Sequence, residues 1–254
     1  MALKGDVGLY LSGDKVCIKE CNIVITPPSI RDIFVSIGED NFLIATQILT
    51  NLDRFVKDVK EGNLELNILS DFQVLLVILQ GEPRIKKIVL DFFDLIFPDY
   101  DIKVTENSIE FYLKESQSLV SVMNPFNFEV FQTVVSELFE PQNPTEEEFN
   151  PIDDKAKEIA EKLKKGREKR NQMKAQGKNQ TQNTSLFATQ ASVLSIGLGM
   201  DINIFYNYTP FQLFDAFIRY TSKLAYDFYQ RVSTMPFMNT SELEAPDDWT
   251  RGLY

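Results

Sequence analysis

The strongest local signal in this chain is Thr209–Val232, TPFQLFDAFIRYTSKLAYDFYQRV. It opens with Thr209-Pro210, a typical helix start, because a hydroxyl oxygen caps free backbone N–H groups and proline fits the first helical position. Apolar residues then recur at three- and four-residue steps, while opposite charges stand four residues apart on the other side. The apolar positions are Phe214, Phe217, Ile218, Leu224, Phe228 and Val232. The stretch therefore predicts an amphipathic helix.

The residues on either side of this stretch belong with it. Phe187–Leu198 is a run of small and apolar residues that predicts another helix, interrupted at Gly197 and Gly199. Further on, Asp248-Trp249 lies in a terminus that we expect to be extended. We interpret residues 186–254 as a small helical C-terminal domain.

The segment before this domain has a different composition. Residues 151–185 are basic and rich in glutamine and asparagine, and few of them could form a core. A short helix is expected near the start of the segment, where Asp153-Asp154 can cap an apolar face containing Ile159 and Leu163. The composition predicts a flexible basic linker after the acidic residues 1–150.

Two parts of residues 1–150 have the pattern of short β-hairpins. Residues 7–25 contain strand-like runs at Gly8–Leu11, Val16–Ile18 and Cys21–Ile25, with a Ser12-Gly13-Asp14 turn between the first two. Asp101–Thr105 and Ser108–Leu113 alternate polar and apolar residues around Glu106-Asn107. We expect strands at both places.

Helical spacing occupies most of the remaining N-terminal residues. The expected helices start after Pro27-Pro28, at Ser70-Asp71, at Arg84 and at Asn124-Pro125, with breaks at Gly38, Gly81 and Pro98. The last of them is expected to run through Phe139. The sequence is therefore assigned to the α+β class: a helix-rich N-terminal domain (1–150) with short β-hairpins, a flexible basic linker (151–185) and a small helical C-terminal domain (186–254).

The composition limits the class of function. The chain has 254 residues, a net charge of −11 and no histidine. Without histidine it lacks the commonest general base and the commonest zinc ligand, so we expect no enzyme activity, no cofactor and no metal. The negative charge makes nucleic acid an unexpected partner. We expect no membrane partner either, because no run approaches the roughly 20 apolar residues of a membrane span and the start does not resemble a signal peptide.

The chain contains two cysteines, Cys17 and Cys21. Two are too few to staple a chain of this length, which favours a reducing cytosol. On a strand their spacing places both on one side, where we expect them to serve as small packing residues.

Three charged segments invite a functional interpretation. Asp99–Glu110 resembles a calcium loop, but it has Val104 where the sharp turn needs glycine, so a solvated hairpin is favoured. Asp91 and Asp94 share one helical face, as catalytic carboxylates or magnesium ligands would, although a solvent-facing pair is the simpler interpretation. The Lys155–Lys178 run fits a solvated tether, a protein-docking segment or a nucleic-acid site, and the lack of Phe and Tyr around it disfavours the last.

The aromatic face of the Thr209–Val232 helix is either core or a surface for a partner. Aromatic residues are concentrated here in a module that is too small to bury them all, which leads us to a partner-binding hypothesis. The residues of this hypothesis are Phe211, Phe214, Phe217, Ile218, Leu224, Phe228 and Trp249.

Segments near both ends of the chain resemble one known family. Ile23–Ile33, IVITPPSIRDI, followed by Ile37–Phe42, IGEDNF, resembles the opening of proteins from tail gene clusters of phages that infect Gram-positive bacteria. Ser70-Asp71-Phe72 matches a Ser-Asp-Phe that recurs further along those proteins, and Tyr208–Arg219, YTPFQLFDAFIR, resembles a helix near their C-termini. The resemblance covers about a third of the chain.

The resemblance implies a non-enzymatic phage tail assembly chaperone in the host cytoplasm. Such chaperones commonly have an N-terminal domain that coats the tape-measure protein and a C-terminal domain that recruits the tail-tube protein, and a homo-oligomer is possible. The alternative is a structural virion component, a baseplate or tail adaptor located in the phage tail. A nucleic-acid-associated or enzymatic protein is the third class, and it would need binding that falls steeply with salt or a turnover that no residue here suggests.

Overall fold

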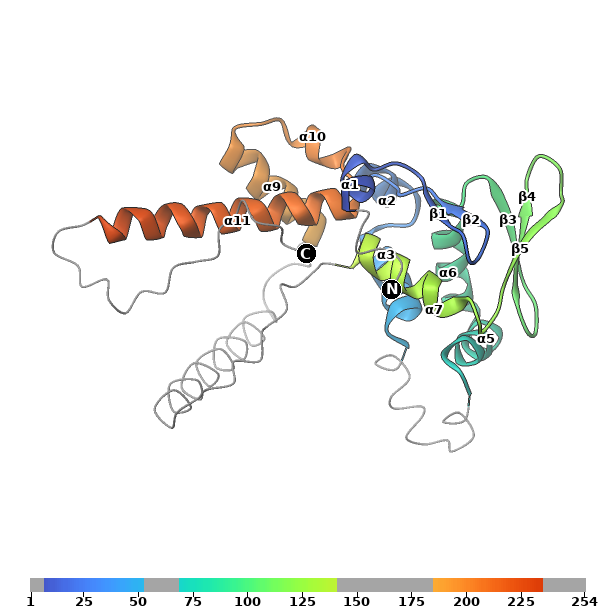
Figure 1. Ribbon diagram of the computed structural model, residues 1–254. Helices are drawn as coiled ribbons and strands as arrows, with labels where there is room; N and C mark the ends of the chain where they lie inside the picture. The colour runs from blue at the N-terminus through green and yellow to red at the C-terminus, as the bar shows by residue number, and fades with distance from the viewer. Residues whose placement is uncertain (1–6, 53–68, 141–184, 235–254) are drawn as a thin grey trace, which may run out of the picture.

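A computed structural model describes residues 7–52, 69–140 and 185–234. Within these ranges the protein has the expected α+β fold, which combines helices with two small antiparallel sheets. Figure 1 shows the larger sheet at one end, a group of helices in the middle, and one long helix, α11, extending away at the other end. The predicted fold class is confirmed.

The N-terminal element α1 (Val7–Ser12) is a helix, so the predicted strand at its position is wrong. Its Tyr10 is 3% exposed and packs edge-on against Phe211, with ring centroids 5.3 Å apart. The Tyr10 hydroxyl donates a hydrogen bond to the Glu137 carboxylate at 3.0 Å. A short apolar run fits either period, so contacts with distant parts of the chain decide between helix and strand.

The expected strand character after the Gly13 turn is confirmed. Strands β1 (Val16–Ile18) and β2 (Ile23–Ile25) form a two-stranded antiparallel sheet in which Val16 pairs with Ile25. The side chains of both terminal pairs are buried.

The two cysteines do not share one side of a strand, so that prediction is wrong. Cys17 lies on β1 and is exposed, whereas Cys21 lies in the turn before β2 and is buried. Burial, with a smaller contribution from the Glu20 carboxylate, raises the pKa of the Cys21 thiol to about 11. A neutral thiol with this pKa is a packing group, as expected for Cys21 alone.

The helices of the central part begin mostly where the sequence predicts. They are α2 (Ile30–Ser36), α3 (Glu39–Thr50), α5 (Asp71–Gly81), α6 (Pro83–Ile96) and α7 (Phe128–Phe139). Ser29 and Ser70 form capping boxes at the starts of α2 and α5. Helix α7 starts later than expected, because the side chain of Asn124 accepts the Phe126 backbone N–H and closes a turn before the helix.

The larger sheet has the strand order β3-β4-β5: β3 (Tyr100–Val104), β4 (Ile109–Leu113) and β5 (Leu119–Met123). The β3–β4 hairpin confirms the predicted hairpin at the calcium-like segment, and Lys103 pairs with Glu110 across it. Strand β5 was not expected. Its buried Ser121 hydroxyl donates a hydrogen bond to the Cys21 carbonyl, which joins the two sheets.

The hydrophobic core is built largely from phenylalanine rings. The ring of Phe42, on α3, lies 5.3 Å from Phe92 on α6 and 5.5 Å from Phe139 on α7, measured between centroids. The same ring lies 6.1 Å from Phe187, which is more than a hundred residues further along the chain. All four rings are fully buried.

The described C-terminal elements are α9 (Leu186–Leu198), α10 (Ile202–Tyr206) and α11 (Pro210–Ser233). They pack into the same core as the N-terminal elements rather than standing apart from them. The carboxylate of Glu39, itself 8% exposed, accepts the Phe187 backbone N–H at 2.8 Å, and the Ile30 N–H donates to the Tyr208 carbonyl at 2.8 Å. The predicted domain boundaries stay predictions, and the predicted linker, apart from Ser185, lies outside the described residues.

Candidate functional site

The residues of the partner-binding hypothesis divide into two groups along α11. Phe211 and Phe214 are core residues, 4% and 3% exposed. Phe217 and Ile218 are half-buried. Leu224 and Phe228 are exposed by 48% and 66%, and Trp249 lies outside the described residues. The structure thus places the first residues of the predicted surface in the core and leaves Leu224 and Phe228 exposed.

The first half of α11 is held at its start by the predicted cap. The Thr209 side chain accepts the Gln212 N–H and the Gln212 side chain accepts the Thr209 N–H, which completes a capping box ahead of Pro210. The amide of Gln212 also donates to the Leu11 carbonyl of α1 at 2.7 Å. These bonds fix the helix to the body of the protein, so the aromatic side chains that follow enter the core.

Helix α9 covers the next part of α11. Phe187 packs against Phe214 with ring centroids 5.8 Å apart. Ten residues later, Gly197 meets the ring of Tyr220 so closely that an added Cβ would lie 1.9 Å from the Tyr220 hydroxyl. The sequence predicted an interruption at Gly197, but α9 continues through this residue. The helix ends at Leu198, and its C-cap residue Gly199 has a φ of 66°, the left-handed conformation that glycine tolerates best.

Beyond Tyr220 the long helix continues without α9 beside it. Residues 221–233 add about 20 Å of helix at 1.5 Å per residue. The exposed Leu224 and Phe228 lie on this part, which we call the distal half of α11, whereas Val232 near its end is 7% exposed. Figure 1 shows the distal half projecting from the body of the molecule.

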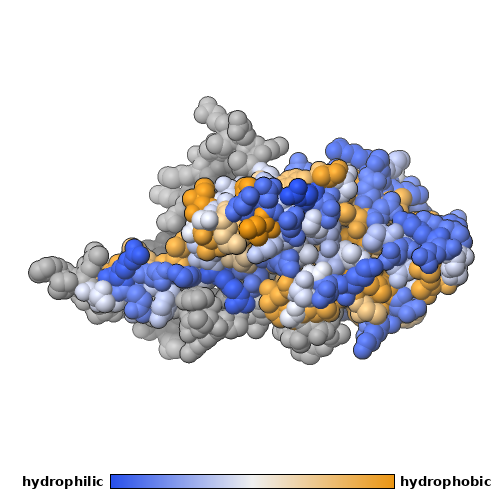
Figure 2. Space-filling model, turned by 90° about the horizontal axis from the view of Figure 1, so that it is seen from above, coloured by the Kyte–Doolittle hydropathy of each residue, from blue (hydrophilic) through white to orange (hydrophobic). Residues whose placement is uncertain are grey.

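Helices α9 and α10 carry further exposed apolar side chains. These are Leu186, Val193, Ile196, Leu198 and Ile204, with Ile196 81% exposed, and Met200 between the two helices is exposed as well. Figure 2 shows hydrophobic residues interspersed with hydrophilic ones on this face of the molecule. No charged residue occurs between Leu186 and Met200 in the sequence. The lack of charge in this run is a sequence signal for an apolar surface. The partner-binding prediction rests on the aromatic residues of α11 and therefore misses these residues.

Ion pairs on α11 follow the same division. Arg219 Nε lies 2.9 Å from a carboxylate oxygen of Asp215, whose side chain is 7% exposed. Lys223 and Asp227 pair at 2.7 Å with both side chains more than 40% exposed. Both pairs were expected from their i,i+4 spacing. The first pair lies against the core, whereas the second is solvated and contributes little to stability.

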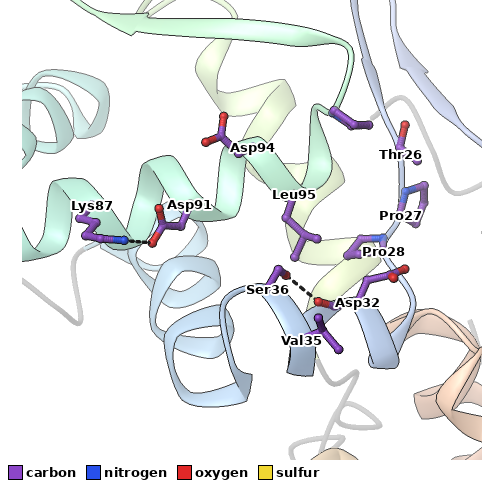
Figure 3. Close-up of a pocket in the computed structure, with 11 residues that line it drawn as sticks. Thr26, Pro27, Pro28, Asp32, Val35, Ser36, Lys87, Asp91, Asp94 and Leu95 are labelled. Atoms are coloured by element: carbon purple, nitrogen blue, oxygen red, sulfur yellow. Dashed lines mark hydrogen bonds and ion pairs between the residues drawn. The ribbon is translucent and has the colours of Figure 1, made fainter.

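A hollow of ≈ 650 Å³ opens between the Pro27-Pro28 segment, α2 and α6 (Figure 3). Asp91 and Asp94 both line it, so they do share one side of their helix, and Asp32 of α2 adds a third carboxylate. Lys87, another lining residue, donates to Asp91 at 2.6 Å. The hollow is acidic and open to solvent.

Two of the three carboxylates of this hollow have partners within the protein: Asp91 pairs with Lys87, and Asp32 is bonded at the start of α2. Asp32 accepts the Ser29 backbone N–H and hydroxyl in the capping box of α2, at 3.1 and 2.6 Å. Among the described residues, no group of three or more His, Cys, Asp or Glu side chains is placed to hold a metal ion. The hollow therefore offers surface charges rather than a recognisable catalytic or metal-binding arrangement, and the exposed apolar side chains of α9, α10 and the distal half of α11 form the stronger candidate site.

Comparison of the chain with models of protein families, with curated proteins and with solved structures gave no match. In the part of the chain that the structure describes, none of the helices combines the length and the apolar character needed to span a membrane.

Proposed function

We propose that this protein is a non-enzymatic assembly factor of a phage tail, which binds a structural tail protein through the exposed apolar side chains of α9, α10 and the distal half of α11. The observation that carries the proposal is the exposure of large apolar residues there, above all Ile196 at 81% and Phe228 at 66%. The resemblance of the chain to phage tail proteins supplies the class of partner.

Exposed apolar side chains lower the free energy of a complex when a partner removes them from water. Removing one large apolar side chain fully from water stabilises a complex by about 1.5–3 kcal/mol. The cores of protein interfaces are depleted in charge, as the stretch from Leu186 to Met200 is. Binding is therefore a better use of this surface than catalysis, in a chain whose sequence has no histidine.

The direct test is co-purification of the full chain with the tail-tube and tape-measure proteins of the same phage. The wild-type chain should retain at least one of them. Ile196→Asp should weaken retention about tenfold or more, because it places a charge where an apolar contact is expected. The matched control is Val77→Asp on α5, where the side chain is 49% exposed but lies outside the proposed surface. Failure of the wild-type chain to retain either protein would overturn the proposal.

An inventory of purified phage particles separates an assembly factor from a structural tail component. A chaperone should be missing from the mature particle. Its presence at a fixed stoichiometry would instead assign the chain to a baseplate or tail adaptor, which would use the same surface permanently.

A further inference from the structure

The two edges of the sheet β3-β4-β5 differ in how their backbone groups are paired. At the β5 edge, the Asn22 side chain donates to the Val120 carbonyl at 3.3 Å. The Asn127 side chain donates to the Val122 carbonyl at 3.0 Å. These amides occupy acceptors that a further strand would otherwise use. Among the described residues, the β3 edge has no such cover.

The hydrogen bonds between β3 and β4 determine which β3 backbone groups point outward. Thr105 N–H donates to the Ser108 carbonyl at 2.9 Å, and bonded and non-bonded positions alternate from there along the antiparallel pair. Ile102 and Val104 therefore direct their N–H and C=O groups away from β4. In the described part of the chain, no residue donates to these carbonyls or accepts from these N–H groups. The β3 edge is thus free to pair with another strand.

The side chains along β3 favour a second copy of the same strand at this edge. Asp101 and the exposed Lys103 lie on the solvent face of the sheet, on either side of Ile102. A lysine in an edge strand usually discourages pairing. However, when a second β3 runs antiparallel with Ile102 on a two-fold axis, each Lys103 stands opposite the Asp101 of the other copy. These are non-hydrogen-bonded positions, where side chains come closest.

The same register also pairs the free backbone groups. Each Ile102 N–H meets the Ile102 carbonyl of the other copy, and each Val104 N–H meets the Tyr100 carbonyl. The groups that β4 leaves unpaired are therefore the groups that this arrangement uses. An interface about a two-fold axis has to complement itself, and β3 does so in both charge and hydrogen bonding.

We propose that two copies of this protein associate through their β3 edges, antiparallel about a two-fold axis at Ile102, and so join their larger sheets into one. Figure 1 shows this sheet at the opposite end of the molecule from the distal half of α11. The contact leaves the exposed side chains of α9, α10 and α11 free in both copies. It can therefore hold or fail independently of the proposed partner binding.

Sedimentation equilibrium of the full chain tests the proposal and should show a dimer that dissociates on dilution. Asp101→Lys places like charges opposite each other on both sides of the axis, so the dissociation constant should rise about tenfold or more. Lys103→Asp should have the same effect. The double variant Asp101→Lys/Lys103→Asp restores opposite charges in the same register and should recover most of the affinity.

Three controls separate the edge contact from other effects. Asp101 also accepts the Gln117 amide at 2.7 Å, and Gln117→Gly removes that bond without a change of charge at a position whose φ of 53° suits glycine. Glu115→Lys makes the same change of charge as Asp101→Lys in an exposed turn away from the edge. Neither should alter the dissociation constant. Ile196→Asp should weaken partner retention and leave the dimer intact, so the two proposals can fail separately.

Proline at the axis tests the backbone bonds. Ile102 N–H faces away from β4, so Ile102→Pro removes both bonds at the axis without removing a bond between β3 and β4. This variant should be a monomer.

Several results would overturn the proposal. The wild-type chain could remain a monomer at every concentration, or the single charge variants could dimerise as it does while circular dichroism shows an intact fold. A double variant that dimerises no more tightly than the single variants would mean that Asp101 and Lys103 do not face each other.

Discussion

The two halves of α11 share one apolar period and have opposite surroundings. Phe214 in the first half is 3% exposed, whereas Phe228, about four turns later, is 66% exposed. Both occupy the same kind of position in the same amphipathic pattern. The difference lies in the neighbours: Phe214 meets Phe187 of α9, and α9 ends before it can reach the distal half of α11. A periodic pattern fixes which face of a helix is apolar, while the register of the adjacent helix decides where that face is core.

Alanine substitution at Phe214 and Phe228 should give the largest difference in stability between the two halves of α11. Phe214→Ala removes a buried ring and leaves a cavity, so the free energy of unfolding should fall by about 3–5 kcal/mol. Phe228→Ala should lower it by about 1 kcal/mol or less, because its ring is mostly in water. Urea unfolding followed by circular dichroism measures both values. Equal losses at the two positions would contradict the division of the helix.

Local signals in the sequence were sufficient for much of the fold. The Thr209-Pro210 start, the Ser70-Asp71 start and the hairpin of β3 and β4 were each predictable, because caps, proline and strict alternation act over a few residues. Strand β5 also carried a readable pattern, Leu-Val-Ser-Val-Met, and it was overlooked because no turn of a familiar type precedes it.

The predictions that proved wrong concern residues whose structure depends on contacts with distant parts of the chain. Tyr10 makes α1 a helix through contacts with Phe211 and Glu137, which no local pattern shows. The candidate site failed in part for the same reason. Phe211 and Phe214 fit a partner surface as long as the C-terminal elements are pictured as a separate module, and their burial becomes visible only when those elements share a core with α3 and α7.

Gly197 marks the last point at which α9 covers α11, and it offers a sharper test of the boundary. Gly197→Ala places a Cβ 1.9 Å from the hydroxyl and 2.2 Å from the ring carbon that bears it in Tyr220, so the whole ring must move. Overpacking of this kind should cost about 1–3 kcal/mol and outweigh the roughly 1 kcal/mol that alanine gains over glycine in a helix. Thermal and urea unfolding measure the net effect.

The control for this substitution is Gly81→Ala in α5, where an added Cβ meets no atom within 4 Å. That change should be neutral or stabilise the protein by up to about 1 kcal/mol. In the Gly197→Ala background, Tyr220→Ala should cost less than it does alone, because removing the ring also relieves the clash with the added Cβ. Purely additive losses would mean that α9 and α11 are not in close contact at Gly197.

The two ion pairs of α11 give the smallest and most selective comparison. Asp215→Asn removes a charge that is 7% exposed and accepts from Arg219 Nε through both carboxylate oxygens, at 3.0 and 2.9 Å. Arg219 is 34% exposed, so solvent screens part of the pair, and we expect a loss of about 1–2 kcal/mol. Asp227→Asn breaks a solvated pair with Lys223 and should cost about 0.5 kcal/mol or less.

Salt distinguishes the two pairs independently of these magnitudes. Raising the ionic strength to about 1 M shortens the screening length to roughly 3 Å, which should remove the small effect of Asp227→Asn and leave most of the effect of Asp215→Asn. Urea unfolding of the wild type and both variants at low and high salt provides the measurement. If the two substitutions cost the same and both costs vanish in salt, Asp215 is as solvated as Asp227. The first half of α11 would then not lie against the core, and the exposure of Leu224 and Phe228 would no longer set the distal half apart.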